Sequence, residues 1–65
     1  MNDVIAVNIV TKRVRMISEY QDDKNAAAAI YIAIARRGVE EEFFVAVPAD
    51  LYHDGDIWQG KRGDY

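Results

Sequence analysis

A run of ten apolar residues, AAAAIYIAIA at positions 26–35, constrains this chain more than any other stretch. Two aspartates precede it at 22–23, and the basic sequence RRG follows it at 36–38. Acidic side chains suit the positive end of a helix dipole, basic ones suit the negative end, and glycine favours termination. The sequence therefore predicts one helix over about residues 23–37. The ten-residue apolar run within it is about half the length needed to span a membrane.

Three other stretches, at residues 3–10, 13–20 and 42–47, have the β-branched content or alternation of strands. The first is apolar on both faces, which is typical of a central strand, whereas the second alternates polar and apolar residues like an edge strand. A hairpin turn at 11–13 joins them, and Pro48 ends the third. The predicted fold is α+β, a two-layer ββαβ arrangement with a three-stranded antiparallel sheet, in the order 2-1-3, packed on one helix.

The predicted helix is apolar nearly all the way round. At about 100° per residue, one side gathers a set that we expect to pack on the sheet. This set is Ala27, Ile30, Tyr31 and Ile34. Ile32 points the opposite way among alanines, which let a second helix approach closely. One helix also leaves one sheet face uncovered, so both features favour a homodimer. The simpler alternative is that the alanines and a single isoleucine are merely exposed.

The chain has 65 residues, no cysteine and a net charge of −3. We expect a single domain over 1–65, with a core at about 3–48 and an irregular tail at 49–65 that frays from residue 60. A domain of this size buries only roughly 60% of its unfolded surface, so a partner subunit would stabilise it. The acidic balance argues against general nucleic-acid binding. No secretion signal is evident, and we expect a cytoplasmic location.

Catalytic and metal-binding patterns are weak. The segment DLYHDGD, at residues 50–56, could offer oxygen ligands to a cation, but its spacing does not match a calcium loop and Asp-Gly turn chemistry explains it better. Ser18 and His53 are the only serine and histidine, and no nucleophile elbow surrounds the serine. We therefore expect neither an enzyme nor a cofactor nor a metal site.

Two sets of residues are candidates for binding. The first would contact a protein partner through apolar, aromatic or acidic side chains. Its members are Ala28, Ile32, Ala35, Glu40, Glu41, Phe44, Tyr52 and Trp58. The aromatic members serve equally well as core residues, so two interpretations stay open for them. The second set, Lys12, Arg13 and Arg15, would contact nucleic-acid phosphates from the predicted hairpin, although cations at a turn are commonly only solvated.

The segment ARRGVEEEFFVAVPADLYHDGD, at residues 35–56, resembles small orphan open reading frames of tailed bacteriophages and prophages. The resemblance implies no active site. It implies a small phage protein that binds and modulates a host protein. The leading hypothesis is therefore a non-enzymatic protein-interaction module that inhibits or modulates a host protein or defence complex. The alternatives are a small nucleic-acid-associated regulator and a structural or assembly factor.

Overall fold

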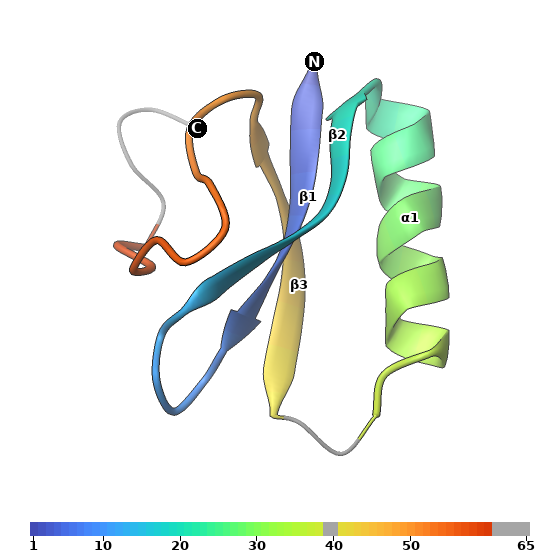
Figure 1. The fold of residues 1–65 in the computed structure, drawn as a ribbon. Helices are drawn as coiled ribbons and strands as arrows, with labels where there is room; N and C mark the ends of the chain where they lie inside the picture. Colours follow the sequence, from blue (N-terminus) through green and yellow to red (C-terminus); the bar gives the residue numbers. More distant parts are fainter. Residues whose placement is uncertain (39–40, 61–65) are drawn as a thin grey trace.

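Three strands and one helix follow one another in a computed structural model that describes residues 1–38 and 41–60. They are β1 (Asn2–Asn8), β2 (Val14–Gln21), α1 (Asp23–Ala35) and β3 (Glu42–Pro48). The strands form an antiparallel sheet in the order β2-β1-β3, which confirms the predicted α+β fold and strand order (Figure 1). No helix among the described residues is long and apolar enough to cross a membrane.

The central strand β1 is the most buried element, as its two apolar faces predict. Residues Val4 to Val7 are all fully buried. The strand ends at Asn8, earlier than predicted, because the Asn8 side-chain oxygen accepts hydrogen bonds from the amides of Val10 and Thr11 at 2.8 and 2.9 Å. This local turn leaves the apolar residues Ile9 and Val10 exposed in the connection to β2.

The chain covers the second sheet face with its own C-terminal segment. Figure 1 shows α1 on one side of the sheet and the segment after β3, coloured orange, on the other. The main core cluster lies on this second face and consists of Ile5, Val7, Val14, Val47 and Tyr52. Trp58 adds to it, with its ring 5.3 Å from that of Tyr52 and 5.5 Å from that of Phe43. The expectation of an uncovered sheet face was therefore wrong, and the core extends beyond residue 48.

The helix begins as predicted and ends slightly early. The Asp22 side chain accepts a hydrogen bond from the Asn25 amide at 2.7 Å, which caps the first turn. The last helical residue is Ala35, and Arg36 is the C-terminal cap. The residue after this cap is Arg37, so Gly38 does not occupy the position directly after the cap, where a terminating glycine usually lies.

The helix face that meets the sheet differs from the predicted one. Ala26 is buried and Ala29, Ile30 and Ala33 are partly buried. Tyr31 and Ile34, expected against the sheet, are 81% and 54% exposed. The observed set is the predicted set moved back by one residue, a rotation of about 100°. Alanines in the contact let the helix lie close to the strands, and the large side chains of Tyr31 and Ile34 remain exposed.

Strand β2 is irregular in its second half. Its register with β1 is constant from Val7↔Val14 to Ile5↔Met16, and then shifts twice before Asn2↔Gln21. The extra residues make bulges, and Tyr20 within the last bulge has a positive φ of 56°. The buried Asp3 carboxylate holds this bend, since it accepts a hydrogen bond of 3.0 Å from the Tyr20 amide.

Candidate functional site

A groove of about 500 Å³ lies between the C-terminal half of α1 and the adjacent face of the sheet. Strand β2, helix α1 and the start of β3 all contribute to its walls. Its lining residues are Arg15, Ile17, Ser18, Ala29, Ile32, Ala33, Arg36, Arg37, Gly38, Glu42 and Phe44. The small side chains of Ala29 and Ala33 leave space here, whereas Ile17, Ile32 and Phe44 make its walls apolar. Ile32 is 52% exposed, so an entering apolar group can contact it.

The charged side chains of the groove are three arginines and one glutamate. Arg15 on β2 reaches Glu42 on β3 and donates two hydrogen bonds to its carboxylate, from Nη2 at 2.9 Å and from Nε at 3.3 Å. Arg36 and Arg37 are exposed and form no ion pair within the described part of the chain. The groove therefore has a formal charge of +2, opposite in sign to the chain as a whole.

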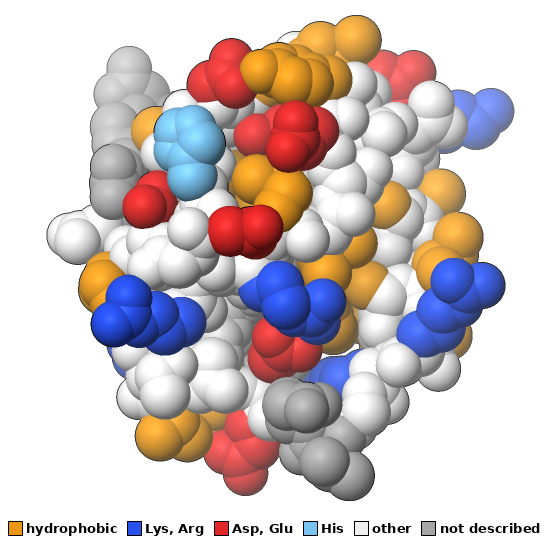
Figure 2. Space-filling view, in the orientation of Figure 1, with side chains coloured by type: hydrophobic (Ala, Val, Ile, Leu, Met, Phe, Trp, Pro, Cys, Tyr) orange, Lys and Arg blue, Asp and Glu red, His pale blue; other side chains and the backbone are white. Residues whose placement is uncertain are grey.

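The surface around the groove is mixed in character. Figure 2 shows Lys and Arg side chains (blue) across the lower half of this face, with hydrophobic atoms (orange) between two of the basic groups on the right. Most of the acidic side chains (red) on this face lie above that basic band. A ligand that fits the groove would therefore combine an apolar group with negative charge.

The structure brings together residues from both predicted binding sets. Ile32 and Phe44, expected to contact protein, line the same groove as Arg15, expected to contact nucleic acid. Ala28 and Ala35 are exposed on the outer side of α1, and Glu41 is exposed just before β3. Glu40 lies outside the described residues.

The remaining candidates lie away from the groove. Tyr52 is fully buried and Trp58 packs on it, so both belong to the core on the opposite sheet face. Lys12 and Arg13 are exposed at the β1–β2 connection, where Arg13 donates a 2.9 Å hydrogen bond to the Gly55 carbonyl. The three hairpin cations therefore do not act as one patch, because Arg15 extends across the sheet instead.

The basic end of the helix contributes more to the site than its sequence indicated. The Arg36-Arg37 pair matches an ordinary dipole-complementing helix end, and that explanation accounts for it without any ligand. What places these arginines at a site is the return of β3 beneath them, which brings Glu42 and Phe44 into the same groove. Strand β2 supplies Arg15 and Ile17 to the same groove, and it lies well before the helix in the chain, so no local pattern could reveal the site.

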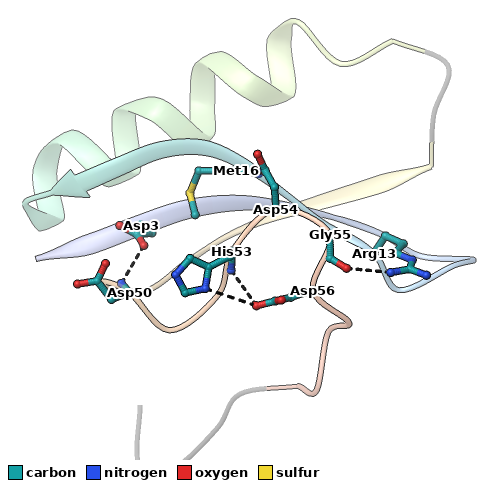
Figure 3. Close-up of polar contacts among 8 residues, drawn as sticks. All are labelled: Asp3, Arg13, Met16, Asp50, His53, Asp54, Gly55 and Asp56. Carbon is teal, nitrogen blue, oxygen red and sulfur yellow. Dashed lines mark hydrogen bonds and ion pairs between the residues drawn. The ribbon is translucent and has the colours of Figure 1, made fainter.

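The acidic loop after β3 uses its carboxylates to hold backbone amides (Figure 3). Asp56 accepts a hydrogen bond of 2.8 Å from the His53 amide, and its carboxylate lies 3.8 Å from His53 Nδ1. Asp54 accepts one from the Met16 amide on β2. Within residues 1–38 and 41–60, no group of three or more His, Cys, Asp or Glu side chains is placed to hold a metal ion. These aspartates therefore stabilise the turns of the loop, and the bond to the Met16 amide attaches the C-terminal segment to β2.

Comparison with known proteins adds no functional assignment to this geometry. No protein-family model, no curated protein and no solved structure matches the chain. The groove and its charge are therefore the basis for the functional proposal.

Proposed function

We propose that this protein is a non-enzymatic interaction module that binds an acidic segment of another protein in the groove between α1 and the sheet. The observation that carries the proposal is the combination of an exposed apolar wall at Ile32 with three arginines, in a protein whose net charge is −3. An apolar side chain of the partner would enter between Ile32 and Phe44. Neighbouring carboxylates would accept hydrogen bonds from Arg36 and Arg37.

The arginines would select the partner more than they increase affinity. Exposed ion pairs contribute little individually, about 0–1 kcal/mol, whereas complementary charge speeds association and rejects wrong partners. The apolar contact would supply the remaining free energy, at roughly 25 cal/mol per Å² of apolar surface removed from water. The biological setting that we propose follows from the resemblance of residues 35–56 to small phage proteins, namely binding and modulation of a host protein in the bacterial cytoplasm.

Nucleic-acid binding is the second candidate, and the groove arginines favour it because they could also contact phosphates. The hairpin that was expected to supply this activity is less suited to it. Arg13 is hydrogen-bonded to Gly55 and Arg15 to Glu42, so these guanidinium groups already have partners. A phosphate backbone would also leave the apolar wall at Ile32 unused, whereas an acidic peptide with an apolar residue uses both.

Peptide titration tests the proposal. The probe is a set of labelled peptides in which one leucine or phenylalanine is flanked by aspartates, and the comparison probes are the same peptides with lysines and a single-stranded DNA oligonucleotide. The test variant is Arg36→Gln with Arg37→Gln, and the control is Lys24→Gln at the opposite end of α1. We expect acidic peptides to bind, with affinity reduced about tenfold in the arginine variant and unchanged in the control.

Two results would contradict the proposal. Binding of the DNA in preference to every acidic peptide would favour the nucleic-acid alternative. Equal affinity of the wild type and the arginine variant for the acidic peptides would show that Arg36 and Arg37 do not contact the peptide, which contradicts the proposed recognition of an acidic segment. An affinity pull-down from bacterial lysate, with the arginine variant as the matched bait, then identifies the natural partner.

A further inference from the structure

The two edge strands of the sheet, β2 and β3, differ in how far their outward backbone groups are hydrogen-bonded. The outer edge of β2 is occupied by the C-terminal segment, since the Val14 amide donates to the Asp56 carbonyl and the Gly55 amide to the Val14 carbonyl, both at 2.9 Å. Farther along, the Met16 amide donates to the Asp54 side chain, and the bulges then twist the strand. Occupied backbone groups and bulges are two ways in which proteins protect an edge from pairing with another chain.

The outer edge of β3 is regular, and no strand or segment among the described residues pairs with it. The register of β3 with β1 is unbroken from Asn2↔Pro48 to Asn8↔Glu42. The Ile9 amide donates to the Glu41 carbonyl at 2.9 Å and the Ala49 amide to the Met1 carbonyl at 3.1 Å, so the odd-numbered residues of β3 face β1. The amides and carbonyls of the even-numbered residues Glu42, Phe44 and Ala46 therefore point outward, and they have no hydrogen-bond partner within residues 1–38 and 41–60.

The β3 edge also lacks the usual protection against pairing. The five residues at 43–47 read FFVAV and contain no charge, and the strand has no bulge. Its only proline is Pro48, at the very end. All of these residues except Val47 are only partly buried, so the strand can bury more apolar surface. Long, flat, apolar edges of this kind take up another strand.

We propose that the β3 edge binds the β3 edge of a second copy of this chain, antiparallel, to form a continuous six-stranded sheet. A two-fold axis at Phe44 pairs it with the second copy's Phe44, and it places Glu42 opposite Ala46 in both directions. All three outward positions of each strand then exchange hydrogen bonds, six in total by the antiparallel pattern. An axis at Val45 would instead place Glu42 opposite Pro48, which has no amide to donate.

Charge also favours the Phe44 register. The acidic residues Glu41 and Glu42 lie opposite Val47 and Ala46 of the second copy, so no like charges face one another. The axis is perpendicular to the sheet, which places both helices on the same face. This pairing depends on the backbone of β3 and not on the groove arginines, so it stands or falls independently of the proposed function. It also differs from dimerisation through Ile32 on the helix.

Hydrogen exchange of the full chain across a concentration series tests the pairing, with sedimentation run in parallel. As dimer forms, we expect the outward amides of Glu42, Phe44 and Ala46 to exchange at least about tenfold more slowly. The amides of Phe43, Val45 and Val47 face β1, so they serve as an internal control that is protected at every concentration. This comparison uses only wild-type protein and does not depend on a variant that folds.

A substitution in β3 provides a second test of the pairing. Ala46→Pro removes one outward amide while the hydrogen bonds between β1 and β3 remain, and Ala46→Ser is its matched control. We expect the proline variant to be monomeric at concentrations where the serine variant is a dimer. A wild type that stays monomeric up to roughly 1 mM would overturn the proposal. A dimer in which the outward amides still exchange rapidly, and which Ile32→Glu dissociates, would also overturn it and assign the interface to the helix.

Discussion

At the scale of single residues, one carboxylate fixes two bends that the sequence does not suggest. Asp3 is 2% exposed, and its two oxygens accept hydrogen bonds of 3.0 Å from the amides of Tyr20 and Asp50. Those two residues have positive φ angles of 56° and 66°, which non-glycine residues rarely adopt. The charge-assisted bonds offset the cost of these conformations. As a result, the Tyr20 hydroxyl meets the Asp50 carboxylate and donates a hydrogen bond to it.

The Tyr20–Asp50 contact predicts a loss of stability at alkaline pH. The hydrogen bond to Asp50, followed by reduced hydration and the charges of Asp50, Asp3 and Glu19, raises the pKa of Tyr20 to about 12. The folded protein therefore favours the neutral hydroxyl. Its contribution is fully present below the ordinary tyrosine pKa of about 10 and is lost as the pH rises towards about 12.

Urea unfolding at several pH values checks this prediction in the wild type and in Tyr20→Phe. The difference between their free energies of unfolding should be constant below pH 10 and should shrink between about 10 and 12. Tyrosinate absorbance should show a late ionisation that disappears in Tyr20→Phe and moves to lower pH in Asp50→Asn. A difference that does not change with pH would rule out the contact in solution.

At the scale of elements, the sequence predicts what repeats locally and misses what depends on distant contacts. The strand order follows from β1 being apolar on both faces, and the helix start follows from Asp22. The helix orientation does not follow, because an almost wholly apolar run gives no periodicity with which to choose a face. The sheet's second cover was missed because residues 49–60 have no regular secondary-structure pattern, yet Tyr52 fills the core. The groove combines residues from three elements, so only the fold assembles it.

The observed helix orientation predicts that the same substitution lowers the free energy of unfolding at one alanine and hardly changes it at the next. Ala26 is 2% exposed, so Ala26→Leu forces extra volume against the sheet and should destabilise the protein by about 1–3 kcal/mol. Ala27 is exposed, so Ala27→Leu should change the free energy of unfolding by less than about 0.5 kcal/mol. Both substitutions are the same in chemistry and in helix propensity, so each is the other's control. Chemical denaturation measures the difference, and a larger cost at position 27 would restore the orientation expected from sequence.

At the scale of the whole molecule, the sheet is packed on both faces, by α1 on one and by residues 49–60 on the other. The second cover has backbone as well as side-chain attachment, because the Trp58 amide donates a 2.7 Å hydrogen bond to the Lys12 carbonyl. Tyr52 adds a 2.9 Å hydrogen bond from its hydroxyl to the Gly60 carbonyl and accepts one of 3.2 Å from the Gln59 amide. A thin sheet with so few elements needs both covers, since small domains have little free energy of unfolding to spare.

We therefore expect the C-terminal segment and the sheet to unfold as one unit. Trp58 is the only tryptophan, so its fluorescence reports the segment, while far-ultraviolet circular dichroism reports the strands and helix. The two denaturation curves should coincide in the wild type. In Tyr52→Phe both midpoints should fall together, and the free energy of unfolding should fall by about 1 kcal/mol, because the two hydrogen bonds of the Tyr52 hydroxyl, to the Gly60 carbonyl and from the Gln59 amide, are lost. A fluorescence transition at lower denaturant than the dichroism transition would mean that the segment detaches first, and that the sheet with α1 is a stable fold without its second cover.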